Sequence, residues 1–382
     1  MAVPDDPLVP VRVIDGGSER LAWSEGMRFS LPQSFLQASQ LSEHQDIAGN
    51  LRVPPTLEVN LPDALDALRR RAAFTDAPPL SARLPVSYQH VPAWLRSAGA
   101  SLIGRWHRRR VERWAAFPGW PLDLSADFLG DLVNDDGRTN GPTAVLLTHD
   151  LDSAEGLQSL VGQFLCLEEK AGARSVNFVV PCAWPIDAAL LHEVRERGHE
   201  IGVHGYDHSN RTAFADAAER RRRLEAGKQV LAGHDVRGYR APSLLRTRGL
   251  LRDVGEFYAF DSSIPTSGGL FPVPNNGCAS ARPFRIEDVA EIPLSLPRDG
   301  SLRFLGYNPE QILELWIKCA ESISRSGGVV VLLTHCEARF SGNKAMLDTY
   351  QRFLEYIAGS DRYSWAGPAD ILARSHKVLS CG

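Results

Sequence analysis

The hydrophobic pattern after residue 140 alternates between short apolar runs of strand length and longer stretches with helical periodicity. Residues 143–147 form an apolar run suited to a strand that is buried on both faces. Residues 155–170 repeat apolar side chains along one helical face. The same alternation predicts further strands at 176–180, 200–203, 237–239, 258–260, 291–294, 329–333 and 363–365, and helices at 187–197, 213–231, 309–325 and 344–358.

This order of elements predicts an α/β fold with a parallel sheet, either open or closed into a barrel. In both arrangements the side chains that carry out chemistry lie where strands end and loops begin. Five polar side chains stand just past an expected strand: Asp150, His204, Arg240, Asp261 and His335. They are the first candidates for a functional site.

Residues 1–140 follow a different pattern, in which proline-rich stretches interrupt short helical segments at 61–74 and 101–117. We expect a mixed α/β extension that packs on the unit formed by residues 141–382 and shapes its substrate cleft or an oligomer contact. Residues 117–124 combine aromatic side chains with prolines, a cluster that would be costly to leave in water. We therefore expect this segment to lie close to the barrel.

Composition limits the classes of function. The chain has 382 residues and a formal net charge of -4 at pH 7, which indicates no general attraction to nucleic acid. Its six cysteines form no CxxC pair, which argues against a disulfide scaffold and a structural zinc site. The chain opens with no secretory pattern, and no apolar run is long enough to span a bilayer. We expect a cytoplasmic protein without a membrane span; the sequence does not indicate its oligomeric state.

A basic run at residues 105–110 allows two interpretations. Its arginines could contact phosphate or an acidic surface. Alternatively, they form the solvated face of a helix whose Trp106 and Trp114 pack inward. The acidic chain around the run favours the solvated face.

Two carboxylates and two imidazoles lie at two of the expected strand ends. A hydrolytic metal site needs three protein ligands and an open position. His204 and His208, four residues apart, can face one ion together with Asp152. This set suits zinc, with cobalt, nickel, manganese or iron as alternatives. Asp150 then remains as the base that deprotonates a water on the metal, whose pKa the metal lowers toward about 7.

Each part of this pattern also has a purely structural interpretation. Histidines four apart are common on surfaces, and Asp152 stands where the N-cap of the next helix would be. The coincidence of these motifs at strand ends favours the metal site. Arg240 can pair with Asp150 and keep it ionised. His335 stands where it can protonate a leaving amine.

The ordered motifs between residues 143 and 373 resemble those of the polysaccharide deacetylases, also called carbohydrate esterase family 4 or the NodB-homology family. The first motif resembles a divergent form that spaces its two aspartates Asp-x-Asp. The matching positions are, in chain order, residues 148–152, His204 and His208, Arg240 and Pro242, and Leu333 and His335, with residues 261–263 and 291–293 between them.

The resemblance implies a distorted (β/α) barrel that uses one divalent metal to remove acetyl groups from N-acetylated sugars. It also implies that a backbone N–H near Pro242 or Ser243 stabilises the oxyanion. The implied roles are catalytic for Asp150 as base, His335 as acid and Arg240 as the partner of the base, metal-binding for Asp152, His204 and His208, and substrate-binding for Pro242, Ser243 and Asp261.

Several residues depart from the family pattern. His149 stands in place of the usual aromatic residue, Leu151 separates the two aspartates, and Ser243 stands where an aromatic residue often follows the proline. We expect His149 to pack or to form hydrogen bonds at the sheet end rather than to bind metal. The carboxylate that orients His335 has three candidates, namely Asp261, Glu291 and Glu310.

The sequence therefore predicts a metal-dependent hydrolase that removes an N-acetyl group from a sugar or glycoconjugate. Its expected substrate is a small molecule or an oligosaccharide, such as a nucleotide-linked or lipid-linked sugar. Two alternatives stay open: a hydrolase of linear or cyclic amides that are not sugars, and a catalytically inactive carbohydrate-binding barrel.

Overall fold

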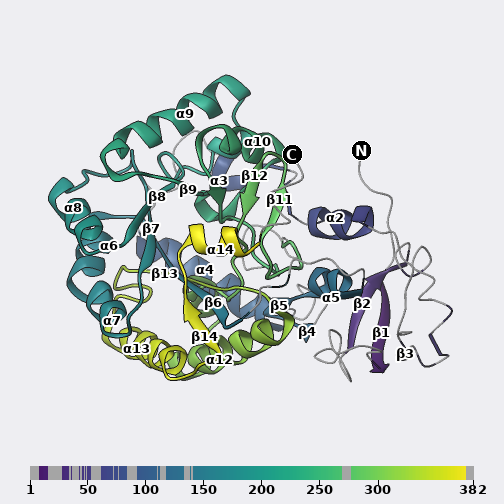
Figure 1. The fold of residues 1–382 in the computed structure, drawn as a ribbon. Coiled ribbons are helices and arrows are strands. Elements are labelled where there is room, and N and C mark those ends of the chain that lie inside the picture. The colour runs from purple at the N-terminus through teal and green to yellow at the C-terminus, as the bar shows by residue number, and fades with distance from the viewer. Residues whose placement is uncertain are drawn as a thin grey trace.

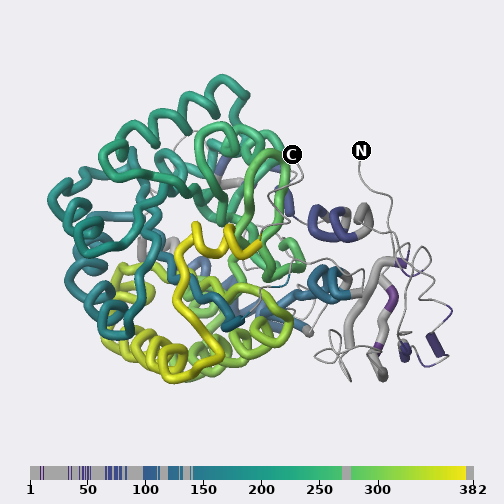
Figure 2. The backbone as a smooth tube through the Cα atoms, viewed as in Figure 1, coloured from purple at the N-terminus to yellow at the C-terminus, as the bar shows by residue number. Residues whose placement is uncertain are grey.

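The computed structural model describes residues 141–268 and 277–375 without a break, and a series of shorter segments before residue 141. In Figure 1 helices form a ring around a central group of strands, and β1 to β3 lie to one side of that ring. In Figure 2 the yellow segment near the C-terminus lies beside the first strand of the central group, because residues 363–365 pair with residues 143–145. No helix in the described part of the chain is long and apolar enough to cross a membrane.

The central sheet has nine strands in the order β11-β12-β10-β9-β8-β7-β6-β13, with β14 also paired to β6. Its neighbours run parallel except for β11 and β12. The strands are β6 Thr143–Leu151, β7 Ser175–Val179, β8 Glu200–His204, β9 Gly238–Arg240, β10 Phe260–Asp261, β11 Phe284–Ile286, β12 Val289–Glu291, β13 Val330–His335 and β14 Tyr363–Trp365.

The segment that follows β12 closes the sheet into a barrel. Leu296 N donates to Val331 O of β13 at 3.0 Å. The Ser295 hydroxyl accepts from Val331 N at 2.7 Å and donates to Val329 O at 2.6 Å. A serine side chain thus replaces part of a regular backbone ladder at the closing point. This irregular closure confirms the expected distorted (β/α) barrel.

The helices connect the strands on the outside of the barrel. They are α6 Ala154–Ser159, α7 Leu165–Lys170, α8 Ala188–Glu196, α9 Ala217–Val230, α10 Arg248–Phe257, α11 Asp299–Phe304, α12 Pro309–Ser326, α13 Lys344–Ala358 and α14 Pro368–Arg374. Polar side chains cap several of these helices, including Asp187 before α8 and Asn308, which forms a capping box with Gln311, before α12.

The elements expected from the hydrophobic pattern are present, with differences at their ends. The expected helix at 155–170 is interrupted by a π-helical segment, Leu160–Phe164. Strand β6 extends to Leu151, beyond the apolar run that predicted it. The pattern did not predict α10, β11, α11 and α14, of which β11 and α11 are too short to show a clear period.

Alternation along β6 and β13 divides their side chains into two groups. Ala144 and Leu146 face the barrel interior and pack with Val331 and Leu333 of β13. Val145 and Leu147 belong to the other core cluster, which includes the apolar faces of the surrounding helices. Successive side chains of a strand point to opposite faces. Every second residue of β6 therefore faces the interior, a pattern that continues to the residues at its end.

The described segments before residue 141 form a mixed α/β arrangement, as expected. Strands β1 and β2 are antiparallel, and β3 pairs parallel to β1. The division of the chain at residue 140 stays a prediction. The elements are β1 Leu8–Asp15, β2 Arg28–Pro32, β3 Asn50–Arg52, α2 Pro62–Arg71, α3 Leu80–Arg83, α4 Ala93–His107, β4 Pro118–Gly119, β5 Leu122–Asp123 and α5 Ser125–Leu132.

Helix α5 docks on the barrel through a buried ion cluster. Asp131 Oδ1 accepts from Arg282 Nη2 at 2.8 Å, and both side chains are fully buried. Asp127 Oδ2 accepts from Ala281 N at 2.9 Å. Phe128 lies between these acids in sequence and is part of the main core. A polar cluster and an apolar contact thus join the extension to the segment before β11.

Residues 118–124 lie against the barrel, as expected. Leu122 and Leu124 are buried in the main core, and Pro121 O accepts from the Ser267 hydroxyl at 2.6 Å. Phe117 lies outside the described residues.

One expectation for the basic run is wrong. Trp106, at the C-terminal end of α4, is 55% exposed and does not pack inward. Leu102, one turn earlier, is also exposed, so this helix presents apolar side chains on its outer surface. Trp114, the second tryptophan of that expectation, lies outside the described residues.

Replacing Arg282 with methionine should lower the free energy of unfolding by about 3–5 kcal/mol, because Asp131 would lose its buried partner. Urea unfolding followed by circular dichroism measures the change. Arg285→Met, at an exposed site three residues later in β11, is the matched control and should change stability by less than about 0.5 kcal/mol. Equal effects of the two substitutions would contradict the proposed docking.

Candidate metal centre and active site

The end of β6 places both aspartates of the first motif on the interior face of the barrel. Because the strand continues through Leu151, Thr148, Asp150 and Asp152 point to one side, whereas His149 and Leu151 point to the other. The Asp-x-Asp spacing therefore brings the two carboxylates together. The N-cap of α6 is Ser153, whose hydroxyl accepts from Gly156 N at 3.2 Å, so the N-cap interpretation of Asp152 is wrong.

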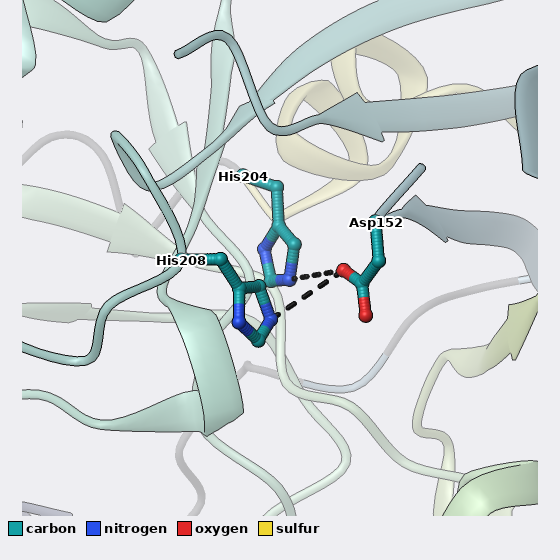
Figure 3. Close-up of side chains that lie close together, drawn as sticks. All are labelled: Asp152, His204 and His208. Atoms are coloured by element: carbon teal, nitrogen blue, oxygen red, sulfur yellow. Dashed lines mark ion pairs between the residues drawn. The ribbon is translucent and has the colours of Figure 1, made fainter. Parts of the chain in front are cut away.

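Asp152, His204 and His208 form a compact group of potential metal ligands (Figure 3). Asp152 Oδ1 lies 3.6 Å from His204 Nε2 and 3.4 Å from His208 Nε2. These separations suit ligands that each approach one ion at about 2.0–2.2 Å. Asp152 Oδ1 is also buried with no hydrogen-bond partner. An orphaned carboxylate oxygen facing two imidazoles fits a divalent cation.

The backbone fixes the orientation of both imidazoles. His204 is the last residue of β8, and its Nδ1 lies 3.1 Å from Arg240 O. The carbonyl requires a proton on Nδ1, which leaves the Nε2 lone pair for a cation. Burial lowers the pKa of His204 to about 4, against the charge of Asp150, and so keeps the ring neutral.

His208 lies in a tightly constrained loop with a left-handed backbone (φ 54°). Gly205 begins the loop, also with positive φ, and a Cβ atom there would lie 2.3 Å from Pro242 Cγ. Glycine thus allows the histidine loop to pack directly on the Arg-x-Pro turn. Asp207 accepts from Ser209 N at 3.0 Å, a structural role within the loop.

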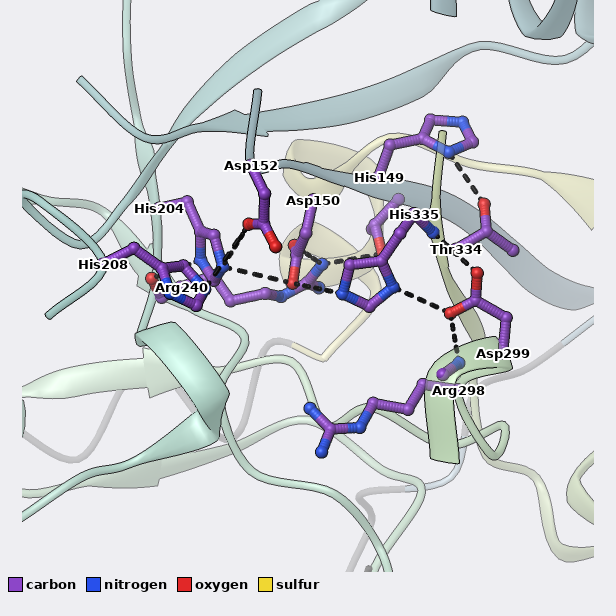
Figure 4. Close-up of polar contacts among 12 residues, drawn as sticks. His149, Asp150, Asp152, His204, His208, Arg240, Arg298, Asp299, Thr334 and His335 are labelled. Atoms are coloured by element: carbon purple, nitrogen blue, oxygen red, sulfur yellow. Dashed lines mark hydrogen bonds and ion pairs between the residues drawn. The ribbon is translucent and has the colours of Figure 1, made fainter. Parts of the chain in front are cut away.

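Asp150 lies between the potential ligands and a buried arginine (Figure 4). Its Oδ1 accepts from Arg240 Nη1 at 3.0 Å, and its Oδ2 lies 3.5 Å from His204 Nε2. Burial raises the pKa of Asp150, but its interactions with His204, Arg240 and His335 together outweigh burial and lower the pKa. Asp150 is therefore an ionised carboxylate beside the potential metal ligands.

Arg240 is held on several sides. Its Nε donates to Ser262 O at 2.8 Å, and its Nη1 also donates to Thr148 Oγ1 at 2.9 Å. The guanidinium carbon lies 4.1 Å from the centre of the Phe178 ring. These contacts account for a guanidinium that is completely buried.

His335, at the end of β13, is oriented by Asp299 of α11. His335 Nδ1 lies 2.8 Å from Asp299 Oδ1, and its backbone N donates to Asp299 Oδ2 at 2.8 Å. Burial lowers the pKa of His335, but the charge and hydrogen bond of Asp299, with the charge of Asp150, outweigh it and raise the pKa to about 9. The imidazolium form is therefore favoured at neutral pH.

The sequence interpretation missed Asp299, and its three candidates for this carboxylate were wrong. Glu310 lies on the surface and pairs with Arg352 at 2.5 Å. Asp261 and Glu291 are completely buried beside one another, where burial and the charge of Asp261 raise the pKa of Glu291. Asp299 begins a short helix and follows no apolar strand. The signal that located the other site residues was therefore missing.

Asp261, predicted as a substrate-binding residue, lies inside the wall of the barrel. Its side chain has no exposed surface, and its carboxylate accepts from the Ser263 hydroxyl at 2.7 Å and from Ser263 N at 3.1 Å. After β10, residues 262–264 continue beside residues 292–294, where Ile292 N donates to Asp261 O and Leu294 N donates to Ile264 O, each at 2.9 Å. Asp261 supports the wall of the barrel instead.

Glu337 is a second residue that the sequence interpretation missed. Its Oε1 accepts from Asp152 N at 3.2 Å and from the Ser153 hydroxyl at 2.8 Å. It thus holds the backbone of a potential metal ligand. Burial and the charge of Asp152 raise the pKa of Glu337 to about 7.

His149 does not face the site, which confirms the expectation that it packs and forms hydrogen bonds. It lies on the outer face of β6, with Nδ1 2.8 Å from Thr334 Oγ1 and Nε2 2.7 Å from Glu168 Oε1. Tyr350 donates to the same Glu168 oxygen at 2.8 Å. The histidine thus satisfies a buried carboxylate between the sheet and α7.

Pro242 and Ser243 lie in the turn after β9. Residues Pro242–Leu244 form a 3₁₀ turn in which Ser243 and Leu244 both have positive φ, 52° and 56°. Such values are unusual outside glycine and recur at functional sites. The N–H groups of Leu244 and Leu245 donate to Ala241 O and Pro242 O.

Comparison with protein families gives a match over the first part of the barrel. Residues 137–257, which include Asp150, His204, His208 and Arg240, match the family model described as polysaccharide deacetylase. This part of the chain is thus similar to polysaccharide deacetylases. No curated protein matches the chain.

Solved structures align with this chain at low sequence identity. A probable polysaccharide deacetylase from Pseudomonas aeruginosa PAO1 aligns with a TM-score of 0.51 and 16% identity, over 69% of this chain and 100% of that chain. A putative polysaccharide deacetylase from Mycobacterium smegmatis aligns with a TM-score of 0.49 and 22% identity, over 63% and 91%. The likeness to the Pseudomonas aeruginosa protein, at 16% identity, concerns the fold alone.

Replacing His204 with alanine should abolish stoichiometric metal binding, because three protein ligands are the usual minimum for such a site. Elemental analysis of the purified protein after dialysis measures the metal content. The control is His149→Ala, which removes another buried imidazole on the opposite face of β6 and should leave the metal content unchanged. Metal retained at wild-type level by His204→Ala would exclude this site.

Proposed function

We propose that this protein is a metal-dependent hydrolase that removes the N-acetyl group from a sugar or glycoconjugate. One observation carries the proposal: an ionised carboxylate and an imidazolium lie together beside a group of three potential metal ligands. Asp150 Oδ2 is 4.0 Å from His335 Nε2 and 3.5 Å from the ligand His204. Amide hydrolysis needs a base for water and an acid for the leaving amine, and this arrangement offers both.

Asp152, His204 and His208 would hold the metal, for which zinc is the best match to two imidazoles and one carboxylate. When bound, a divalent cation would polarise the amide carbonyl and lower the pKa of a neighbouring water. The same ligand set accommodates cobalt, nickel, manganese or iron. The proposal is therefore a single site for one divalent cation, with zinc as the proposed metal.

Asp150 would act as the general base. It lies on the ligand side of the site, and Arg240 binds its Oδ1 and leaves Oδ2 toward His204 and His335. This contact orients the carboxylate and lowers its pKa, so that it accepts a proton from the attacking water at neutral pH.

His335 would act as the general acid. Asp299 binds Nδ1 and directs Nε2 toward Asp150. Its raised pKa keeps a proton available for the departing amine, as the tetrahedral species collapses. The backbone N–H of Ser243, in the strained turn after β9, would donate to the oxyanion.

The substrate class rests on the family match together with the acid and base geometry. Polysaccharide deacetylases act on acetamido sugars, and we propose the same bond for this chain. One assay measures the release of acetate from N-acetylglucosamine and its oligomers or conjugates. A parallel assay measures the hydrolysis of cyclic ureides and formamides, and the comparison separates sugar deacetylation from hydrolysis of other amides. Absence of acetate release from every acetamido sugar by the zinc-loaded protein would refute the proposal.

Asp150→Asn should reduce kcat for acetate release by about 10²–10⁴-fold, because an amide cannot accept the proton. Metal content and the thermal unfolding temperature report whether the site and the fold are intact. A variant that keeps its metal and fold but loses turnover supports the role as base. Turnover within tenfold of the wild type would remove Asp150 from the mechanism.

Asp299→Asn should reduce kcat by about 10–100-fold while KM stays within about twofold, because the imidazolium loses the carboxylate that orients it. Steady-state kinetics on one acetamido sugar separate the two constants. Glu310→Gln, which alters an acid on the surface, is the control and should leave both constants unchanged. A change in KM alone would contradict a positioning role for Asp299.

A further inference from the structure

A small cavity lies beside the candidate active site, with walls from three separate parts of the chain. The extension contributes Trp120 and Pro121, the turn after β9 contributes Leu244 and Arg246, and the segment after β12 contributes Leu296 and Arg298. The cavity volume is about 40 Å³, whereas one water needs about 10–15 Å³. It can hold a group the size of a carboxylate or phosphate, but no sugar ring.

Two residues of the cavity wall are sequence neighbours of residues in the proposed reaction centre. Leu244 directly follows Ser243, the proposed oxyanion donor, and Arg298 directly precedes Asp299, which holds His335. Figure 4 shows the Arg298 side chain extending from Asp299 below the His335 ring. A substrate whose amide lies at His335 could therefore place a neighbouring substituent in this cavity.

The charges that line the cavity favour an anion. Among the described residues of its walls are two guanidinium groups, Arg246 and Arg298, and no carboxylate. Arg298 is half-buried, and its Nε donates to the Ser301 hydroxyl at 2.8 Å, which holds the planar group at the wall. Most other wall residues are apolar, and a low local dielectric strengthens attraction to a negative group.

Arg246 supplies a second, fixed positive charge behind the wall. Its side chain is completely buried and donates to Leu244 O. Its backbone is anchored by Thr75 of the extension, whose N donates to Arg246 O at 2.7 Å. Burial lowers the pKa of Arg246 to about 10, against the charges of Glu291 and Asp261, so the group stays protonated at neutral pH.

From this geometry we infer that the cavity is a subsite for an anionic substituent, a carboxylate or a phosphate, on the sugar whose acetamide is cleaved. The inference rests on the proposed deacetylase function and specifies its substrate class. Arg298 is the group that contacts the anion, and Trp120 and Pro121 make the extension part of the subsite.

Kinetics with matched substrates tests the subsite. The substrates are N,N′-diacetylchitobiose as the neutral reference, N-acetylglucosamine 1-phosphate for phosphate and N-acetylmuramic acid for carboxylate. Arg298→Ala should lower kcat/KM for an anionic substrate by about 10–100-fold and leave the neutral one within about twofold. Arg298→Lys should lower kcat/KM for the anionic substrate by less, because lysine keeps the positive charge but lacks the planar guanidinium group. Whichever anion responds identifies the source.

The control variant is Arg252→Ala, which removes an exposed arginine beside Glu287, at the opposite end of β12 from the site. It should leave all rates unchanged. If Arg298→Ala lowers the rates of neutral and anionic substrates equally, the subsite is refuted while deacetylation stands.

A binding measurement separates failure of the subsite from failure of the proposed function. Calorimetric titration of the zinc-loaded protein with N-acetylglucosamine 1-phosphate, N-acetylmuramic acid and N,N′-diacetylchitobiose needs no turnover. Tighter binding of either anionic sugar, lost in Arg298→Ala, supports the subsite even if no acetate is released. Equal affinities for neutral and anionic sugars overturn it.

Discussion

The buried ion pair between Arg240 and Asp150 is the contact on which the interior of this barrel depends. Arg240 comes from β9 and reaches Asp150 and Thr148 of β6, while its Nε and Nη2 donate to Ser262 after β10. It also lies over the Phe178 ring of β7. A completely buried guanidinium is tolerable only with such partners, since an unpaired buried charge costs several kcal/mol, roughly 3–5 when one partner of a pair is lost. The pair therefore joins several strands and at the same time sets the ionisation of the proposed base.

The twofold alternation of β6 separates the proposed catalytic groups from structural polar groups. Asp150 and Asp152 point inward to His204, whereas His149 points outward to Glu168 and Thr334. The inward-facing aspartates and the outward-facing His149 are adjacent in sequence, but the contacts above join them to different partners. Replacement of the usual aromatic residue by His149 is therefore compatible with an intact site, because a buried carboxylate on the outer face compensates for the polar ring.

Elements far from the motifs complete the arrangement. Asp299 orients His335 from a short helix, Glu337 holds the backbone of Asp152, and Thr75 of the extension anchors Arg246. Helix α5 is fixed to the barrel by the buried pair of Arg282 and Asp131. The extension is thus attached by both apolar and ionic contacts, and it contributes to the cavity that borders the reaction centre.

The sequence by itself determined the alternating strands and helices of residues 143–365 and the side chains at the strand ends, because periodicity and strand length are local properties. It also determined that Asp150, Asp152, His204, His208, Arg240 and His335 would converge, since parallel strands end at one edge of a sheet. Only the tertiary structure decided which carboxylate serves His335, that Asp261 is buried within the wall, and that Trp106 faces outward. Those outcomes depend on which distant segments pack together, and the free energy of such contacts is not encoded in any single stretch of sequence.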